Sequence, residues 1–153
     1  MLLAIDVGNT DAKFALFDLG SGPPQAARLV ARWRIATDDR RTEDEYAVSL
    51  HQLLRMEGHE RTAVTAVIIA TVVPRALHNL QLLAQKYFGV EALVAGRGSV
   101  GWGIQLKVDE PQAVGADRAV NAIAAQALAP HIDKLVISFG TATTYDHIGK
   151  DGS

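Results

Sequence analysis

The sequence of 153 residues contains no cysteine, which excludes a disulfide framework and a thiolate metal site. It also lacks any run of like charge, because 15 basic and 17 acidic residues are interspersed for a formal net charge of −2. This balance argues against an electrostatic nucleic-acid binder, a membrane-surface helix or an acidic tail. We therefore expect a small or neutral partner, and neither nucleic acid nor a membrane.

No apolar stretch is long enough to suggest a transmembrane span, and Asp6 interrupts the N-terminal apolar run that a signal peptide needs. These absences predict a cytoplasmic protein. The length corresponds to one domain of roughly 100–200 residues, or to one lobe of a larger protein. Apolar residues make up 48% of the chain, which is enough to form a hydrophobic core.

Hydrophobic patterning predicts three consecutive strands at the start of the chain, at residues 2–6, 12–18 and 29–35. A helix follows, and Thr42 with Glu45 forms a sequence typical of a capping box at its start. Strands that first follow one another and then alternate with helices are typical of a mixed α/β lobe.

The rest of the chain alternates between strand and helix. A Val- and Ile-rich run at 63–73 predicts a central strand, and Pro74 begins a helix that continues towards Gly89. The remaining expected elements are a strand at 90–95, an alanine-rich helix at about 115–129 and a hairpin of 135–139 with 143–148. The predicted order is therefore βββαβαβα followed by ββ.

Two segments of the sequence follow one plan. Residues 5–10 and 137–142 each end an apolar strand with a small or acidic residue, an apolar residue and a glycine, and hydroxyl or amide residues come next. This repeat predicts a duplicated fold in which two similar lobes each present a strand-turn-strand to a shared cleft. We expect the first lobe to span residues 1–133, and residues 134–153 to form the opening hairpin of a truncated second lobe.

The first copy carries the residues expected of a phosphate-binding turn. Asp6 ends an apolar strand, and its carboxylate is suited to hold Mg²⁺ directly or through water. Gly8 has no side chain to keep phosphate oxygens from backbone N–H groups, and Asn9, Thr10 and Lys13 are able to donate to phosphate. The alternative is an ordinary hairpin turn, in which glycine and asparagine are favoured. The position of Asp6 at the end of an apolar strand favours the phosphate-binding turn over the ordinary hairpin turn.

A second candidate site lies at the start of the alanine-rich helix, where Gly115, Ala116, Asp117 and Arg118 follow one another. Free N–H groups and the helix dipole favour an anion at this position. The alternative is that Asp117 is a helix-stabilising acid and Arg118 a solvated base. Residues 140–144 form a second hydroxyl-rich glycine turn. The alternative is a β-hairpin in which the threonines occur because they favour strands.

The histidines and Ser138 do not suggest further chemistry. The five histidines show no metal-ligand spacing. Ser138 has no histidine partner that the sequence places beside it, so we propose no hydrolase triad.

Four motifs, in this order along the chain, resemble those of the type III pantothenate kinases: Asp6–Thr10, Ala70–Pro74, Val114–Arg118 and Phe139–Thr144. These kinases belong to the actin-like ATPase and sugar-kinase superfamily of duplicated RNase H-like lobes. The resemblance implies an α/β fold, with an RNase H-like (actin-like ATPase) lobe built on a mixed sheet and followed by a β-hairpin. It also implies ATP-dependent phosphorylation of pantothenate on its 4′-hydroxyl, the first step towards coenzyme A.

The resemblance further implies roles for individual residues. The segment from Asp6 to Lys13 would bind the ATP phosphates and Mg²⁺, and Thr141 would contact the nucleotide. Asp117 would be the general base on the pantothenate hydroxyl, in a reaction that needs mainly positioning, charge neutralisation and an acceptor for one proton. The residues that line the substrate would be Gly115, Ala116, Asp117 and Arg118.

The chain departs from the family pattern in three ways. The family has an aspartate in place of Ser138, which helps to bind a monovalent cation (K⁺) near the phosphates, and a neutral hydroxyl does not replace its charge. Asp11 adds negative charge beside the phosphate turn, and the family chain continues through a whole second lobe. We therefore expect impaired kinase activity and a homodimer. The alternative is a non-catalytic single-lobe module that self-associates and binds phosphate or nucleotide weakly.

Overall fold

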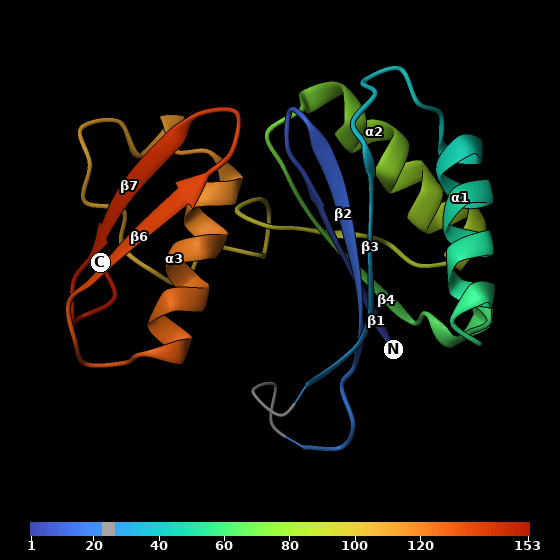
Figure 1. Cartoon of the computed structure of the whole chain (residues 1–153), viewed down its shortest axis with the longest axis horizontal. Coiled ribbons are helices and arrows are strands. Elements are labelled where there is room, and N and C mark those ends of the chain that lie inside the picture. The colour runs from blue at the N-terminus through green and yellow to red at the C-terminus, as the bar shows by residue number, and fades with distance from the viewer. Residues whose placement is uncertain (23–26) are drawn as a thin grey trace. The chain divides into compact units, whose positions relative to one another are not determined.

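Three antiparallel strands open the chain, as predicted: β1 (Leu2–Val7), β2 (Asp11–Asp18) and β3 (Arg28–Ala36) (Figure 1). The computed structural model describes residues 1–22 and 27–153. Alternate side chains of β1 and β2 are buried on one face of the sheet, as the period of two along a strand requires.

Two further strands extend this sheet on the other side of β1. The strand β4 (Ala66–Thr71) lies parallel to β1, and the short strand β5 (Leu93–Val94) lies parallel to β4. The strand order is β3-β2-β1-β4-β5. β4 begins later than predicted because Arg61–Ala63 forms a 3₁₀ turn, and β5 is shorter than predicted because only two of its residues pair with β4.

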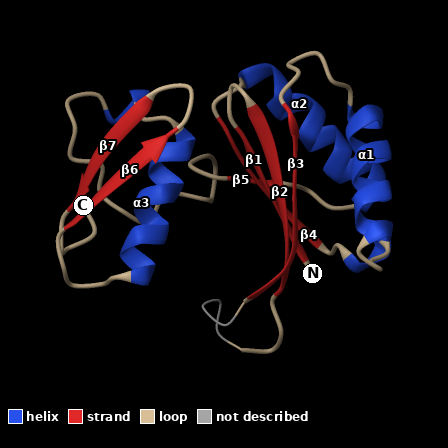
Figure 2. Ribbon diagram, in the orientation of Figure 1, coloured by secondary structure: helices blue, strands red, loops and turns tan. Residues whose placement is uncertain are grey.

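Two helices cover one face of the sheet (Figure 2). Helix α1 (Glu43–Met56) begins with the predicted capping box, in which Thr42 and Glu45 bond to each other's backbone N–H groups. Helix α2 (Pro74–Leu83) starts at Pro74 and continues as a π-helical turn, Ala84–Phe88. Gly89 ends this turn with a φ of 69°, a left-handed conformation that glycine adopts at little cost.

The main hydrophobic core lies between the sheet and these helices. Tyr46 of α1 is fully buried, and its ring packs edge to face on Phe14 at 6.2 Å between centroids. Its hydroxyl finds no hydrogen-bond partner in the part of the chain that the structure describes. Burial raises the pKa of Tyr46, so the phenol is neutral. The largest other fully buried side chains are Leu3, Leu16, Leu50, Leu54, Ile69, Leu80 and Leu83.

Residues 95–153 form a second compact unit, separate from the unit of residues 1–94. Helix α3 (Ala116–Leu128) packs against a hairpin of β6 (Lys134–Phe139) and β7 (Thr143–Ile148). The element order therefore confirms the predicted α/β fold, with βββαβαβα followed by a hairpin. A boundary between duplicated lobes at residue 133 stays a prediction from the repeat.

The outer face of the hairpin is apolar and exposed. Alternate residues of β6 and β7 turn towards α3, and the opposite face carries Leu135, Ile137, Phe139 and Tyr145. Phe139 is 82% exposed. Among the described residues, no helix combines the length and apolarity needed to cross a membrane.

The unpartnered hydroxyl of Tyr46 makes the first prediction. Tyr46→Phe removes a buried polar atom and keeps the contacts of the ring with Phe14 and with Arg41, whose guanidinium carbon lies 5.4 Å from the ring centroid. We expect the free energy of unfolding to stay the same or to rise by up to about 1 kcal/mol. Leu50→Ala, in the same helix, should instead cost about 2–5 kcal/mol. Denaturant unfolding measures both, and a loss above about 1 kcal/mol in Tyr46→Phe would show that the hydroxyl is hydrogen-bonded.

Candidate functional site

The turn between β1 and β2 lies at the carboxyl end of β1, beside the carboxyl end of its parallel neighbour β4. In open α/β sheets, ligands bind in the crevice outside the carboxyl ends of the parallel strands. The last ladder pair is Val7 with Ala12, and the Gly8 N–H donates to the Asp11 carbonyl at 3.0 Å to close the turn. The structure therefore brings together the first set of predicted residues: Asp6, Gly8, Asn9, Thr10 and Lys13.

Asp6 and Lys13 are direct partners across the β1–β2 ladder. The Lys13 Nζ lies 3.4 Å from the Asp6 Oδ2, and the two side chains are 61% and 34% exposed. A pair this exposed contributes at most about 1 kcal/mol, so both groups are able to turn to a ligand. A single accessible carboxylate fits Mg²⁺, which binds through one or two carboxylates together with phosphates and water.

The space beside Gly8 fits a closely approaching ligand. A Cβ built on Gly8 would meet its nearest heavy atom, the Asp11 carbonyl oxygen, at 3.6 Å, which is an ordinary contact. The backbone of Gly8 is not in the left-handed region, so the turn itself does not require glycine. The Gly8 N–H is already bonded, whereas the Asn9 N–H bonds to no acceptor within the described residues and is available to an anion.

Asp11 does not add an uncompensated charge beside this turn. Its Oδ2 lies 3.5 Å from an Nη atom of Arg34, which comes from the neighbouring strand β3. The departure from the family pattern at Asp11 is therefore offset by a nearby guanidinium.

The Ala70–Pro74 motif connects β4 to α2 behind the turn. The Thr71 hydroxyl accepts from the Val73 N–H at 2.9 Å, and it lies within donating distance of the Val7 carbonyl at 3.1 Å. Thr71 therefore ties the end of β4 to the end of β1. Pro74 then occupies the first helical position, where its missing N–H costs nothing.

The second set of predicted residues lies in the other compact unit, at the start of α3. Gly115 is the N-cap, and it supplies no side-chain hydrogen bond to the helix. Asp117 stands exposed in the first turn, and its Oδ1 accepts from the Arg118 N–H at 2.9 Å. The Oδ2 of Asp117 makes no hydrogen bond within the described residues, which leaves it able to accept a proton from a bound hydroxyl.

Arg118 is paired with a residue that the sequence analysis missed. Its Nε donates to the Oδ1 of Asp146 on β7 at 2.8 Å, and its Nη2 donates to the same oxygen. Asp146 is only 14% exposed, and its hydrogen bond raises the pKa of Arg118, which keeps the guanidinium charged. Asp146 shares the inward face of β7 with Ile148, and an acid on the inward face of a predicted strand is the signal that could have revealed this pair.

A cavity of about 330 Å³ adjoins this ion pair within the second unit. Its walls are mostly apolar, with a few charged groups, which is the usual composition of a small-molecule pocket. Of the four residues predicted to line the substrate, Arg118 lies on this cavity, and Gly115, Ala116 and Asp117 are not among its lining residues. The other lining residues include Lys107, Val114, Ala119, Asp146 and Ile148.

The remaining predicted residues, Ser138 and Thr141, lie on β6 and in the turn between β6 and β7. Thr141 is exposed in the turn, and the Gly140 N–H donates to the Ala142 carbonyl at 3.1 Å. Ser138 is the ladder partner of Thr144, whose buried hydroxyl lacks a hydrogen-bond partner in the described ranges. Two neutral hydroxyls supply no charge, so these residues do not fit a K⁺ site of the family kind.

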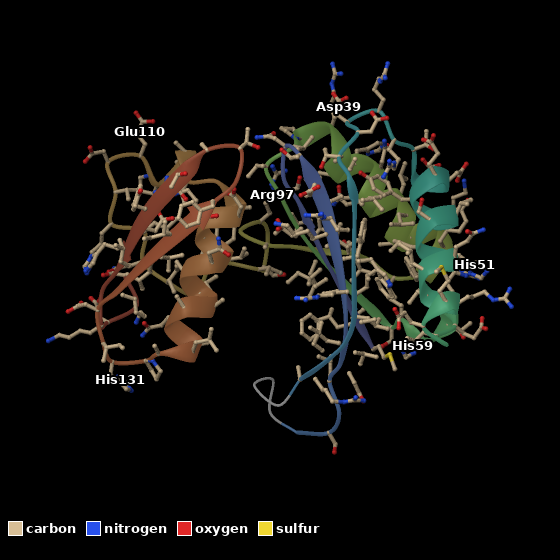
Figure 3. The ribbon with its side chains drawn as sticks, viewed as in Figure 1. Asp39, His51, His59, Arg97, Glu110 and His131 are labelled. Atoms are coloured by element: carbon tan, nitrogen blue, oxygen red, sulfur yellow. The ribbon has the colours of Figure 1, made fainter. Side chains whose placement is uncertain are left out.

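Among the described residues, no histidine belongs to a group of three side chains that could hold a metal ion. His51 and His59 are labelled at separate positions of the first unit (Figure 3). Within residues 1–22 and 27–153, no three His, Asp or Glu side chains are grouped so that they could hold a metal ion. Mg²⁺ at Asp6 would therefore depend on phosphate and water for its other ligands.

Comparison with known proteins relates this arrangement to one family. The family model of the type III pantothenate kinases matches residues 2–153. Curated relatives with that name are 75% identical in Sphingopyxis alaskensis, 66% in Rhizorhabdus wittichii and 53% in Zymomonas mobilis, each over the whole of this chain. The chain spans only 53–56% of the length of these relatives.

A solved structure supports the fold. The crystal structure of the Aquifex aeolicus member of the Ppx/GppA protein family superposes with a TM-score of 0.50 at 14% identity, and the match covers 99% of this chain and 48% of that one. This likeness shows the fold alone, and it agrees with the predicted RNase H-like (actin-like ATPase) lobe. The four motifs, the fold and the match over residues 2–153 show that the chain belongs to the type III pantothenate kinase family.

Proposed function

We propose that this chain binds ATP at the β1–β2 turn and takes part in the transfer of its γ-phosphoryl group to the 4′-hydroxyl of pantothenate. The observation that carries the proposal is the turn itself. At the carboxyl end of two parallel strands, it combines an accessible carboxylate, an adjacent lysine and a backbone N–H that bonds to no acceptor among the residues described. Membership of the family supports the choice of pantothenate as substrate.

In this proposal the turn residues bind and orient the triphosphate. The Asn9 backbone N–H and the Lys13 ammonium donate to phosphate oxygens, and Asn9 and Thr10 add side-chain donors. Asp6 would hold Mg²⁺, which would neutralise charge that develops on the phosphates when it is bound. Displacing Lys13 from Asp6 costs little, because both side chains are exposed.

The start of α3 supplies the groups for the acceptor substrate. Asp117 accepts the proton of the 4′-hydroxyl through Oδ2, while the Arg118 N–H holds Oδ1 in place. Asp146 fixes the position of the charged Arg118 guanidinium beside the cavity. Gly115 has no side chain and Ala116 only a methyl group, so both leave the helix start open to substrate.

Thr141 concerns nucleotide binding in this proposal, and Ser138 concerns the rate of phosphoryl transfer. Thr141 would contact the nucleotide from the exposed β6–β7 turn. Because Ser138 lacks the charge of the family aspartate, we expect turnover below the roughly 1 s⁻¹ of ordinary kinases. Release of ADP, measured with and without pantothenate, separates a slow kinase from a module that only binds nucleotide.

We also propose that the chain forms a homodimer through the outer face of the β6–β7 hairpin. This face carries four large exposed apolar side chains, and two-stranded sheets are only marginally stable alone. Both edges of the hairpin lack a neighbouring strand among the residues described, which also favours pairing with a second copy.

Gly8→Ala separates a structural glycine from a ligand-binding one. Because the added methyl has room and the backbone is not left-handed, we expect stability to be unchanged or to rise by about 0.4–1 kcal/mol. The methyl would instead hold phosphate away from the turn, so the affinity for MgATP should fall about tenfold or more, a loss of at least about 1.4 kcal/mol. Calorimetry measures the affinity, and Gly101→Ala, which meets no atom within 4 Å, is the matched control. Unchanged MgATP binding in Gly8→Ala would contradict the proposed site.

Asp117→Asn tests the proposed general base. The amide keeps the shape of the side chain and removes its basicity, so pantothenate-dependent ADP release should fall about 10²–10⁴-fold while the fold is retained. Asp109→Asn changes an exposed acid of the same unit and should leave the rate unchanged. Equal rates in Asp117→Asn and in the unsubstituted chain would rule out this assignment.

Light scattering tests self-association. We expect a mass above that of the monomer at micromolar concentration, and Phe139→Lys should lower it by placing a charge on the apolar face. Val48→Lys alters an exposed apolar residue of α1 and should leave the mass unchanged. A monomer mass for the unsubstituted chain would refute the dimer.

A further inference from the structure

The carbonyl groups of the β1–β2 turn are almost all occupied by donors from the protein. The Val7 carbonyl accepts from the Val72 N–H at 3.1 Å, and the Asp11 carbonyl accepts from the Gly8 N–H at 3.0 Å. The carbonyls of Gly8 and Thr10 lie between them. An anion is repelled by exposed carbonyl oxygens, so their engagement by the protein is a condition for binding phosphate at this turn.

One residue, Thr37, engages both of these middle carbonyls. Its hydroxyl donates to the Gly8 carbonyl at 2.7 Å, and its backbone N–H donates to the Thr10 carbonyl at 2.8 Å. Thr37 follows directly after β3, whose last ladder pair joins Ala36 to Asp11. The β2–β3 register therefore delivers Thr37 to the side of the turn.

The hydrogen bond from the Thr37 hydroxyl to the Gly8 carbonyl also determines the direction of the Asn9 N–H. The Gly8 carbonyl and the Asn9 N–H belong to one planar peptide unit, and a trans unit points its C=O and N–H in opposite directions. Because the Thr37 hydroxyl holds the Gly8 carbonyl, the Asn9 N–H points away from Thr37. No acceptor within the described ranges bonds to this N–H, so it remains available to a ligand.

The segment that follows Thr37 is fastened to α2. The Arg75 Nη1 lies 3.3 Å from the Asp39 Oδ2. The Asn79 side-chain amide donates to the Arg41 carbonyl at 2.8 Å. Figure 3 shows Asp39 at the same end of the first unit as the β1–β2 turn. The part-buried Asn79 bond restrains the segment after Thr37, and the exposed Arg75–Asp39 pair adds little to this restraint.

We propose that Thr37 is a positioning residue for phosphate binding, which holds the Gly8 carbonyl back so that the Asn9 N–H is presented to the triphosphate. Thr37 does not touch the ligand in this account. The inference rests on the proposed function, because it assumes that the β1–β2 turn binds the ATP phosphates.

Thr37→Val tests the hydroxyl, since valine keeps the shape and the backbone N–H and removes only the O–H donor. We expect the affinity for MgATP and for magnesium triphosphate to fall about tenfold or more. Thr37→Ser retains the donor and should bind both within about twofold of the unsubstituted chain. Thr65→Val is the matched control, because its hydroxyl lies near the Met1 carbonyl (3.4 Å) at the opposite end of β1. Calorimetry at a temperature where all four chains are folded gives the comparison.

An amide spectrum of the unsubstituted chain supplies a second readout that does not depend on any variant folding. Titration with magnesium triphosphate should shift the Asn9 amide resonance strongly and the Gly8 amide less, because the Gly8 N–H is already bonded within the turn. In Thr37→Val the Asn9 shift should be reduced.

The outcomes distinguish this inference from the proposed function. If the unsubstituted chain binds no triphosphate, the proposed function fails and the role of Thr37 fails with it. If the chain binds triphosphate at the turn and Thr37→Val binds equally well, the proposed function stands and the role of Thr37 is refuted. A loss of affinity in Thr37→Val that Thr37→Ser does not share supports the positioning role, because valine and serine differ in the donor that the account requires.

Discussion

The parallel pairing of β1 with β4 is the constraint on which the candidate phosphate site depends. A parallel neighbour cannot be reached by a tight turn, so the chain passes through β2, β3 and α1 before β4 begins. The crossover brings the carboxyl ends of β1 and β4 together and places the start of α2 behind them. Thr71 and Thr37 then reach the β1–β2 turn from opposite neighbours, β4 and β3.

The charges around the two predicted sites differ in how firmly they are held. At the β1–β2 turn, Lys13–Asp6 and Arg34–Asp11 are exposed pairs at 3.4 and 3.5 Å. Such pairs are weak, so an incoming anion is able to rearrange them. Arg118 and Asp146 form a less exposed pair with two hydrogen bonds to one carboxylate oxygen. A guanidinium fixed in this way suits a site that must present charge at one position.

The second unit is held together by polar contacts more than by a core. Only Ala119 and Ile148 are buried apolar residues in residues 95–153. The Lys134 ammonium donates to the carbonyl of Ala129, the C-cap of α3, at 2.9 Å. It also donates to the carbonyl of Ile132, in the segment between α3 and β6, at 2.7 Å. The apolar residues that could have formed a larger core lie on the outer face of the hairpin, which is why this face is expected to find a partner.

Local sequence determined most of the elements and the composition of the site, because capping, strand alternation and glycine turns depend on neighbours along the chain. Thr42 with Glu45 marked the start of α1, Pro74 marked α2, and the Asp6–Lys13 segment formed the predicted turn. The extent of β5 was not predictable, since only Leu93 and Val94 pair with β4, and the path of the chain around them depends on tertiary packing. Arg118 pairs with Asp146, which lies 28 positions further along the chain. Thr37 contacts Gly8 and Thr10, which lie 29 and 27 positions before it. Those contacts follow from sheet register and helix packing, which only the tertiary structure decides.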